Sequence, residues 1–351
     1  MINTIVWKKN KARIIDQTKL PLRLEYIDLS DLRQLWGAIS SLKVRGAPAL
    51  GAAAALGVYL GTKDLKTVSW GKFHSRLKQV IRYIGSSRPT ARNLFWGLER
   101  VYKTALVNKE KPVGRIKQEI LREAKRIIEE DRLSCRKIGE FGEKLLKHGS
   151  VVLTICNAGA LATIDYGTAL GVIYSAKAKG KRIKVFACET RPLLQGARLT
   201  SWELDKNGVD VTLISDNTAA SLMADKKISL VITGADRISA NGDSANKIGT
   251  FNLAILAKYH KIPFYIAAPL STFDQSISTG SDIVIEMRPA DEIRKLLGKK
   301  LIAPLKAKVF NPAFDVTSAQ LISGIITEQG IIRPVNRKNI SQAIRNRNAQ
   351  K

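Results

Sequence analysis

At 351 residues, 45% of them apolar, the chain is longer than one hydrophobic core usually supports, so it predicts two domains. The formal net charge of +28 attracts anions such as phosphorylated metabolites or nucleic acid, but Lys and Arg are spread along the whole chain and select no partner. No apolar run reaches the roughly 20 residues of a membrane-spanning helix, and the N-terminus has no secretory pattern. The three cysteines are irregularly spaced and form neither a disulfide framework nor a zinc pattern. We therefore expect a cytoplasmic protein with no membrane contact.

The N-terminal third predicts a mainly helical domain that begins with a short β segment. Apolar and β-branched residues at 5–7 and 13–16 predict two short strands joined by a turn. An Asp or Ser within residues 28–31 can cap the first helix, which is expected to run to Ile39. Helical periodicity then recurs over residues 47–60, 68–84, 92–107 and 115–133.

After Gly149, short continuous apolar strands alternate with helical segments. This order is typical of a parallel sheet covered by helices on both faces, so we expect an α/β fold with a Rossmann-like C-terminal domain. The predicted strands are 150–155, 183–187, 209–214, 230–233 and 264–268. We place the domain change inside the long charged helix, which predicts a helical domain over 1–125 and a catalytic domain over 126–332.

The remaining segment, residues 333–351, has six basic residues and no acidic one. Such a composition is typical of a disordered, solvated tail. Nucleic-acid contact through this tail is an alternative, but aromatic side chains that stack bases are not interleaved with the basic ones.

Polar residues follow the predicted strands of the C-terminal domain, where ligands bind in open parallel sheets. Cys156 follows the first strand and precedes a predicted helix, whose free amides favour a thiolate; a buried structural cysteine is the alternative. Asp236 follows the fourth strand beside Arg237, and its alternatives are a helix cap or an ion pair with that arginine. Cys188 ends the second strand and is a weaker candidate, whereas Cys135 is interpreted as structural.

Three segments combine a cation with Gly or Pro at a predicted helix start, a geometry suited to phosphate. These are residues 45–48 with Arg45, 87–90 with Arg88, and 246–250 with Lys247. For any one of them a surface ion pair is the alternative. The sequence contains no Walker loop, dinucleotide fingerprint or His-Glu-x-x-His motif, so nucleotide hydrolysis, dinucleotide redox chemistry and zinc proteolysis have no support.

Several segments recur together in a fixed order: VRGAPALG at 44–51, SRPTARNL at 87–94, CNAGALAT at 156–163, YGTALG at 166–171, ETRPLLQGARLT at 189–200, GADRI at 234–238 and ANGDSANKIGT at 240–250. Together they resemble the methylthioribose-1-phosphate isomerase family, which is related to regulatory subunits of the translation-initiation guanine-nucleotide exchange factor. The resemblance covers about residues 5 to 330.

The resemblance implies catalysis by Cys156 and Asp236, a homodimer, and a reaction on a small sugar phosphate that needs no metal or organic cofactor. Family members often carry His just before the catalytic cysteine, whereas this chain has Ile155. The substrate contacts implied by the resemblance are Arg45, Gly46, Ala47, Arg88, Gln195, Asn246 and Lys247.

The implied reaction starts from an aldose whose anomeric oxygen is blocked by phosphate, so the ring must open before hydrogen moves from carbon 2 to carbon 1. We expect Asp236 to donate a proton and Cys156 to act as partner base or to stabilise the transition state; a hydride shift is the alternative. Arg45, Arg88 and Lys247 are expected to hold the phosphate and the developing oxyanion. Other functions left open are isomerisation of 5-deoxyribose 1-phosphate or ribose 1,5-bisphosphate, and a non-catalytic regulatory subunit of a translation factor.

Overall fold

The computed structural model describes residues 2–349, which form two compact units. Unit 1 consists of residues up to Ser134 together with Ala160–Gly167, and unit 2 consists of residues 135–159 together with those from Thr168 onward. The change from one unit to the other falls between Ser134 and Cys135, a little later in the chain than the expected position near residue 125. Each unit has its own apolar core.

Unit 1 contains an antiparallel three-stranded sheet and most of five helices. Their bounds are β1 Ile5–Lys8, β2 Lys11–Ile15, β3 Tyr26–Leu29, α1 Leu32–Ser40, α2 Ala47–Thr62, α3 Trp70–Gly85, α4 Arg92–Val107 and α5 Val113–Gly142, whose last residues belong to unit 2. The mainly helical domain with a short β segment is confirmed, and β3 is a strand that the sequence did not predict. Asp31 caps α1 by accepting a hydrogen bond from the Gln34 amide.

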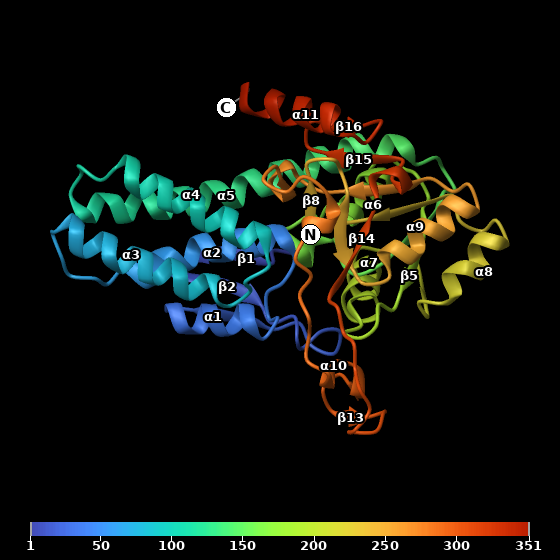
Figure 1. Ribbon diagram of the computed structural model, residues 1–351, viewed down its shortest axis with the longest axis horizontal. Coiled ribbons are helices and arrows are strands. Elements are labelled where there is room, and N and C mark those ends of the chain that lie inside the picture. The colour runs from blue at the N-terminus through green and yellow to red at the C-terminus, as the bar shows by residue number, and fades with distance from the viewer. Residues whose placement is uncertain (1, 350–351) are drawn as a thin grey trace. The chain divides into compact units, whose positions relative to one another are not determined.

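Helix α2 lies at the centre of unit 1, in contact with α3 and α4 (Figure 1). It is rich in Ala and Gly and is buried on nearly all sides, so it has no polar face. A Cβ at Gly97 of α4 would lie 2.3 Å from the carbonyl oxygen of Gly51 in α2. The two helices therefore approach as closely as their backbones allow, which requires glycine at the crossing.

Unit 2 is built on a seven-stranded sheet with the order β16-β15-β10-β7-β4-β5-β6. Its bounds are β4 Val151–Thr154, β5 Lys184–Cys188, β6 Asp210–Ile214, β7 Leu230–Thr233, β10 Phe264–Ala267, β15 Gly324–Thr327 and β16 Gly330–Ile332. All neighbours pair in parallel except β15 and β16. The five predicted strands are all present, and the helices between them are α6 Ala169–Ala178, α7 Ser201–Lys206, α8 Thr218–Ala224 and α9 Thr250–Tyr259.

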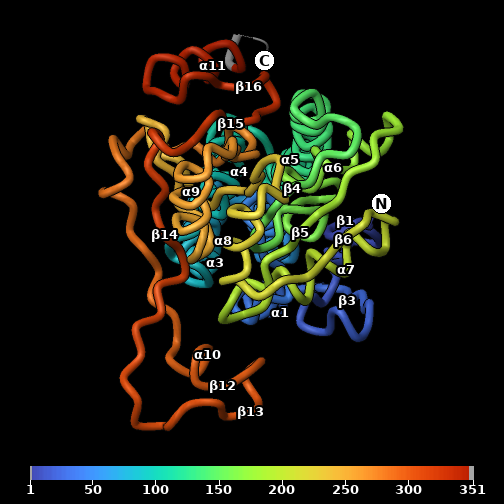
Figure 2. Tube along the Cα trace, turned by 90° about the vertical axis from the view of Figure 1, so that its right-hand side faces the viewer, coloured from blue at the N-terminus to red at the C-terminus, as the bar shows by residue number. Residues whose placement is uncertain are grey.

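A second, four-stranded sheet of unit 2 was not predicted. Its strands are β8 Arg237–Ser239, β9 Ser244–Lys247, β11 Phe273–Asp274 and β14 Phe314–Thr317, in the order β11-β8-β9-β14. Between β11 and β14 the chain forms an extended arm with the short elements α10 Asp291–Arg294, β12 Lys295–Leu296 and β13 Lys300–Leu301. Figure 2 shows this arm, in orange, reaching away from β14.

The segment predicted to be a disordered tail is a helix in the structure. Residues Arg337–Ala349 form α11, and Ile340 on this helix is fully buried. Ala343 and Ile344 also pack on the core of unit 2, and Arg347 lies 3.6 Å from the Glu328 carboxylate. The many basic residues made the segment look disordered, although one face of the helix is apolar. The expectation of disorder is therefore wrong for residues 337–349. Residues 350 and 351 lie outside the described part of the chain. Within residues 2–349, no helix is both long and apolar enough to cross a membrane.

Candidate active site

The strand order of unit 2 reverses between β4 and β7. From β4 the chain moves outward to β5 and β6, then returns to the other side of β4 to form β7. Such a switch point leaves a crevice at the carboxyl ends of the two strands, because the connections leave in opposite directions. Cys156 comes just after β4 and Asp236 just after β7, so the two predicted catalytic residues follow the two strands that flank the switch point.

The loops that carry these two residues are in direct contact. A Cβ at Gly234 would lie 2.8 Å from the Cβ of Ala158, closer than carbon atoms normally approach. Glycine at 234 therefore lets the loop before Asp236 pack against the loop that begins at Cys156.

Two threonines hold the backbone of Cys156. The residue adopts φ +63°, a left-handed conformation that is uncommon for residues other than glycine, and its side chain is 7% exposed. Its N–H donates to Thr190 Oγ1 at 2.9 Å, and its carbonyl accepts from Thr200 Oγ1 at 2.6 Å. The expected helix start is not at Cys156, because the next α-helix, α6, begins only at Ala169.

The threonine that holds the Cys156 amide is itself fixed by Asp216. The two carboxylate oxygens of Asp216 accept from the backbone N–H groups of Thr190 and Arg191, at 2.7 and 2.8 Å. Thr190 also donates from Oγ1 to the Cys188 carbonyl at 2.9 Å. The ends of β4, β5 and β6 are thus linked by one chain of hydrogen bonds. Its residues are visible in the sequence, but the bonds between them could not be predicted from it.

Asp236 begins a β-hairpin. Its N–H donates to the Ala245 carbonyl at 2.9 Å, directly before the β8–β9 pair, and its side chain is half-buried. The helix-cap alternative is therefore wrong for this residue. Its neighbour Arg237 extends toward Asp274, with 3.9 Å between Nη1 and Oδ2.

Asn246 and Lys247 lie in β9 with both side chains buried. Asn246 Nδ2 donates to Thr250 Oγ1 at 3.0 Å. Lys247 Nζ donates to the Ala313 carbonyl at 2.8 Å and lies 5.0 Å from the centre of the Phe314 ring. The predicted cation is present, but in a strand just before α9 and not at the helix start itself.

The turn after Lys247 is held by Asp315 of β14. Its carboxylate accepts from the N–H groups of Gly249 and Phe251, at 2.6 and 3.1 Å, and so covers the start of α9. Burial raises the pKa of Asp315 to about 6, although these two amides and Lys247 act in the opposite direction.

Gln195 is a buried polar side chain with an unsatisfied acceptor. It is 7% exposed, and its Oε1 has no hydrogen-bond partner among the described residues. Buried acceptors are nearly always paired, so this oxygen is suited to a ligand. The π-helical turn Gly196–Thr200 follows, and a Cβ at Gly196 would lie 1.6 Å from the Cys188 carbonyl oxygen, which presses this turn onto the end of β5.

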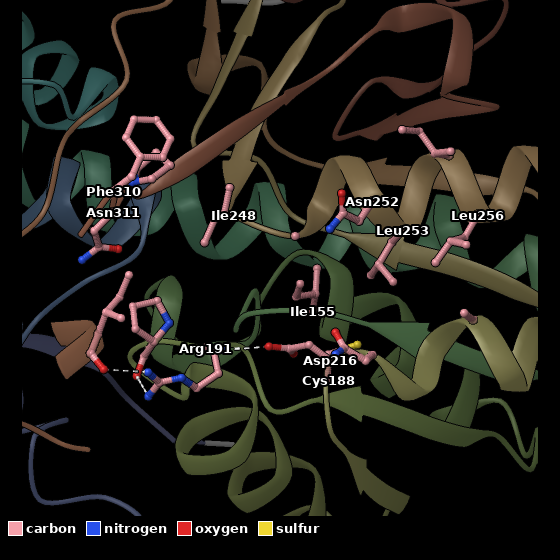
Figure 3. Close-up of a pocket in the computed structure, with 17 residues that line it drawn as sticks. Ile155, Cys188, Arg191, Asp216, Ile248, Asn252, Leu253, Leu256, Phe310 and Asn311 are labelled. Carbon is pink, nitrogen blue, oxygen red and sulfur yellow. Dashed lines mark hydrogen bonds between the residues drawn. The ribbon is translucent and has the colours of Figure 1, made fainter. Parts of the chain in front are cut away.

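Cys188, the weaker candidate, is unsuited to proton transfer. Its side chain is fully buried, and burial, with a smaller contribution from the Asp216 carboxylate, raises the pKa of the thiol to about 12. It lines a cavity of about 660 Å³ at the ends of β4, β5 and β6 (Figure 3). Ile155 and Arg191 also line this cavity, but Cys156, Gln195, Asp236, Asn246 and Lys247 do not.

The other predicted substrate contacts lie in unit 1. Arg45, Gly46 and Ala47 form the start of α2, where Gly46 has φ +91° and a Cβ would lie 2.4 Å from the backbone of Ala162. Glycine is therefore required there both by backbone conformation and by close approach. Arg88 lies half-buried in the turn between α3 and α4.

Comparison with known proteins gives a consistent family. The model of the initiation factor 2 subunit family matches residues 43–334. A methylthioribose-1-phosphate isomerase of Bacillus anthracis is 51% identical over 96% of this chain and 95% of its own. A 5-deoxyribose 1-phosphate isomerase of Moorella thermoacetica is also 51% identical, over 98% of this chain and 97% of its own.

Two solved structures have the same fold over nearly their full length. The 5-methylthioribose 1-phosphate isomerase of Pyrococcus horikoshii superposes with a TM-score of 0.89 at 40% identity, over 98% of this chain and 96% of that one. A protein of A. fulgidus described as translation initiation factor eIF-2B subunit delta superposes with a TM-score of 0.85 at 47% identity, over 98% of this chain and all of that one.

Proposed function

This chain belongs to the initiation factor 2 subunit family, and we propose that it is an aldose–ketose isomerase that converts 5-methylthioribose 1-phosphate into 5-methylthioribulose 1-phosphate, a step of methionine salvage. Relatives that bear this name match it at about half of all positions over almost their whole length. The fold and motif order that the resemblance implied are those of these proteins.

The observation that carries the proposal is the placement of Cys156 and Asp236. They follow β4 and β7, the paired strands at the switch point, on loops that touch at Ala158 and Gly234. A thiol and a carboxyl on touching loops at the carboxyl ends of two paired strands can act as the two proton-transfer groups that an isomerase needs. Cys156 also adopts an uncommon φ of +63°, and such conformations are more frequent at functional sites than elsewhere.

The proposed chemistry moves one hydrogen within the substrate. Protonation of the ring oxygen opens the ring and turns that oxygen into the carbon 4 hydroxyl. A base removes the proton on carbon 2 and returns it to carbon 1, while the carbon 2 hydroxyl loses its proton to the deprotonated donor and becomes a ketone. We assign proton donation to Asp236 and the role of partner base or transition-state stabiliser to Cys156. Atoms and electrons balance within the sugar, so the reaction needs no external oxidant or reductant.

The substrate contacts are proposed from the family motif and from the local environment of each side chain. The unsatisfied Oε1 of Gln195 can accept from a sugar hydroxyl, and Lys247 can provide positive charge for the phosphate. Asn246 lies beside Lys247 in β9 and is held by Thr250. The remaining proposed contacts are Arg45, Gly46, Ala47 and Arg88 of unit 1.

Turnover of three sugars by the purified protein tests the proposal. We expect the highest kcat/KM with 5-methylthioribose 1-phosphate, measured by the formation of the ketose, and lower values with 5-deoxyribose 1-phosphate and ribose 1,5-bisphosphate. Absence of turnover with the methylthio sugar would overturn the assigned substrate.

The second candidate is 5-deoxyribose 1-phosphate, because the Moorella thermoacetica relative that bears this name is as similar as the methylthioribose-phosphate isomerases. The two sugars differ only in the substituent on carbon 5, and the proton chemistry is the same. A regulatory role in translation has the A. fulgidus relative as its support. We favour the enzyme because the predicted thiol, carboxyl, Asn246 and Lys247 are all in place.

We also propose that the chain works as a homodimer in the cytoplasm. Unit 2 exposes large apolar side chains, including Tyr259 and Phe310, which are each 79% exposed, and Val284 at 70%. Water contact with such side chains is unfavourable, so a second copy that covers them would stabilise the protein. The molar mass measured by light scattering after size-exclusion chromatography tests this proposal. A dimer should have twice the chain mass of 38.7 kDa.

A further inference from the structure

A fully buried carboxyl group lies next to the Cys156 loop and has no role in the chemistry described above. Glu203 in α7 is 0% exposed. Its Oε2 accepts from Asn157 Nδ2 at 3.2 Å, and its Oε1 accepts from the Tyr174 hydroxyl at 2.8 Å. Burying a carboxyl group costs free energy unless its oxygens are hydrogen-bonded. The hydrogen bonds of Glu203 therefore explain why a carboxyl group is tolerated at this buried position.

Through Asn157 and Thr200, the hydrogen bonds of Glu203 extend to the backbone of Cys156. Asn157 is the residue after Cys156, and its Nδ2 also lies 3.2 Å from Thr200 Oγ1. That hydroxyl donates to the Cys156 carbonyl. Glu203, Asn157 and Thr200 therefore hold the peptide that follows the thiol.

The backbone on the far side of Asn157 is shaped around the same carboxyl. A Cβ at Gly159 would lie 2.0 Å from Glu203 Oε1, so residue 159 has to be glycine for the carboxylate to reach the loop. The loop from Cys156 to Gly159 is thus wrapped against Glu203. Thr200 and Glu203 reach the loop from the π-helical turn Gly196–Thr200 and the start of α7, and π-turns are often found at functional sites.

We propose that Glu203 is a positioning residue, which holds Cys156 in its left-handed conformation through Asn157. This role rests on the function proposed above, and Glu203 lies outside the sequence segments that resemble the family. The Thr190–Asp216 pair fixes the amide before the thiol, and the Glu203–Asn157 pair fixes the peptide after it. With the second pair removed, the loop relaxes toward ordinary φ values and the thiol becomes more exposed.

The main test compares Glu203→Gln with Tyr174→Phe. Glu203→Gln replaces the charged carboxylate by a neutral amide with a single acceptor oxygen for the two donors, Asn157 and the Tyr174 hydroxyl, which weakens the contact with Asn157; we expect kcat to fall about tenfold with KM within twofold of wild type. Tyr174→Phe removes the other hydrogen bond of the same carboxylate and leaves the contact with Asn157, so its kcat should stay within twofold. Circular dichroism and the melting temperature show whether both variants are folded.

A second arm tests whether Glu203 acts through Asn157. Asn157→Ala should lower kcat about as much as Glu203→Gln, and the double variant should be no slower than either single variant. Additive losses would overturn the proposed connection between the two residues.

The third arm needs no substrate. Iodoacetamide labelling of Cys156, followed by peptide mapping, reports the access to the thiol. We expect labelling at least about fivefold faster in Glu203→Gln and unchanged in Tyr174→Phe. Unchanged labelling in Glu203→Gln overturns the positioning role even if kcat falls. If the wild-type protein turns over none of the sugars, the proposed function fails, and the labelling rates still decide the role of Glu203.

Discussion

The loops after β4 and β5 begin alike and differ in what their cysteines can do. Both strands lie inside the sheet, pair in parallel and are mainly apolar, and a cysteine and then polar residues stand at or just after the end of each. Cys156 lies outside its strand, in a left-handed turn held by two threonines, whereas Cys188 is the last residue of β5 and is completely buried. The thiol pKa of Cys188 is raised to about 12. A cysteine at a strand end is thus not by itself a catalytic candidate: complete burial and a raised thiol pKa argue against Cys188, whereas Cys156 lies in the loop at the switch point.

The largest effect should come from the two proposed catalytic residues. Cys156→Ser and Asp236→Asn each keep the shape of the side chain but remove the thiol or the ionisable carboxyl, and we expect each to lower kcat at least about a hundredfold. Circular dichroism should show an unchanged fold. If either variant turned over substrate at near the wild-type rate, the catalytic role proposed for that residue would be contradicted. The functional difference proposed between the two loops would then have no support.

A smaller effect is expected at Thr190, which links the two loops. Thr190→Ala leaves the Cys156 amide without its acceptor, and we expect kcat to fall about tenfold and the free energy of unfolding to fall by about 1–2 kcal/mol. Thr190→Ser is the matched control, because it keeps Oγ, and its kcat should stay within about threefold of wild type. Equal losses in the Ala and Ser variants would show that the methyl group, and not the hydrogen bond, matters.

The loop after β5 should tolerate loss of its thiol. We expect Cys188→Ala to keep kcat within about twofold and to cost about 1–2 kcal/mol of stability through lost packing. Because its pKa is raised to about 12, Cys188 of the folded wild-type protein should also resist iodoacetamide at pH 8 to 9. Loss of activity in Cys188→Ala with an intact fold would mean that both loops take part in the chemistry.

Asp315, which holds the turn after Asn246 and Lys247, is expected to affect stability more than turnover. The pKa of Asp315 is raised by burial to about 6, above its ordinary value of about 4, so the folded protein favours the protonated form. Its contribution to stability is therefore complete below about pH 4 and is lost as the pH rises through about 6.

Urea unfolding of Asp315→Asn at pH 4 and pH 7 measures this contribution. The free energy of unfolding of the wild type, relative to the variant, should be higher at pH 4 by on the order of 1–3 kcal/mol. A difference that is the same at both pH values would show that Asp315 does not titrate in this range. We expect kcat of the variant at pH 7 to stay within about threefold, because Asn retains one acceptor for the α9 amides.

Much of the fold could be predicted from local pattern. The runs that became β4, β5, β6, β7 and β10 are apolar and continuous, and the periodic segments of unit 1 became α1 to α4 close to their expected bounds. The predictions missed β8, β9, β11 and β14, because these strands are short and polar and are defined by their partners. The prediction of a disordered tail was wrong for a related reason. Composition is dominated by the basic residues, so the three apolar residues Ile340, Ala343 and Ile344 did not indicate a helix, yet they are enough to pack α11 against unit 2.

The candidate site divides in the same way. Sequence alone determined which residue types follow which strands, so it could single out Cys156 and Asp236, because a parallel sheet brings all its strand ends to one edge. Asn246 and Lys247 lie in β9 of the second sheet, and only the cation near a helix start and the family motif pointed to them. Only the tertiary structure decided that the Cys188 side chain is fully buried, that Thr190, Thr200 and Asp216 fix the Cys156 backbone, and that the buried Glu203 contacts the loop after Cys156. These relations depend on hydrogen bonds between residues 25 to 46 positions apart, whose directions no local spacing encodes.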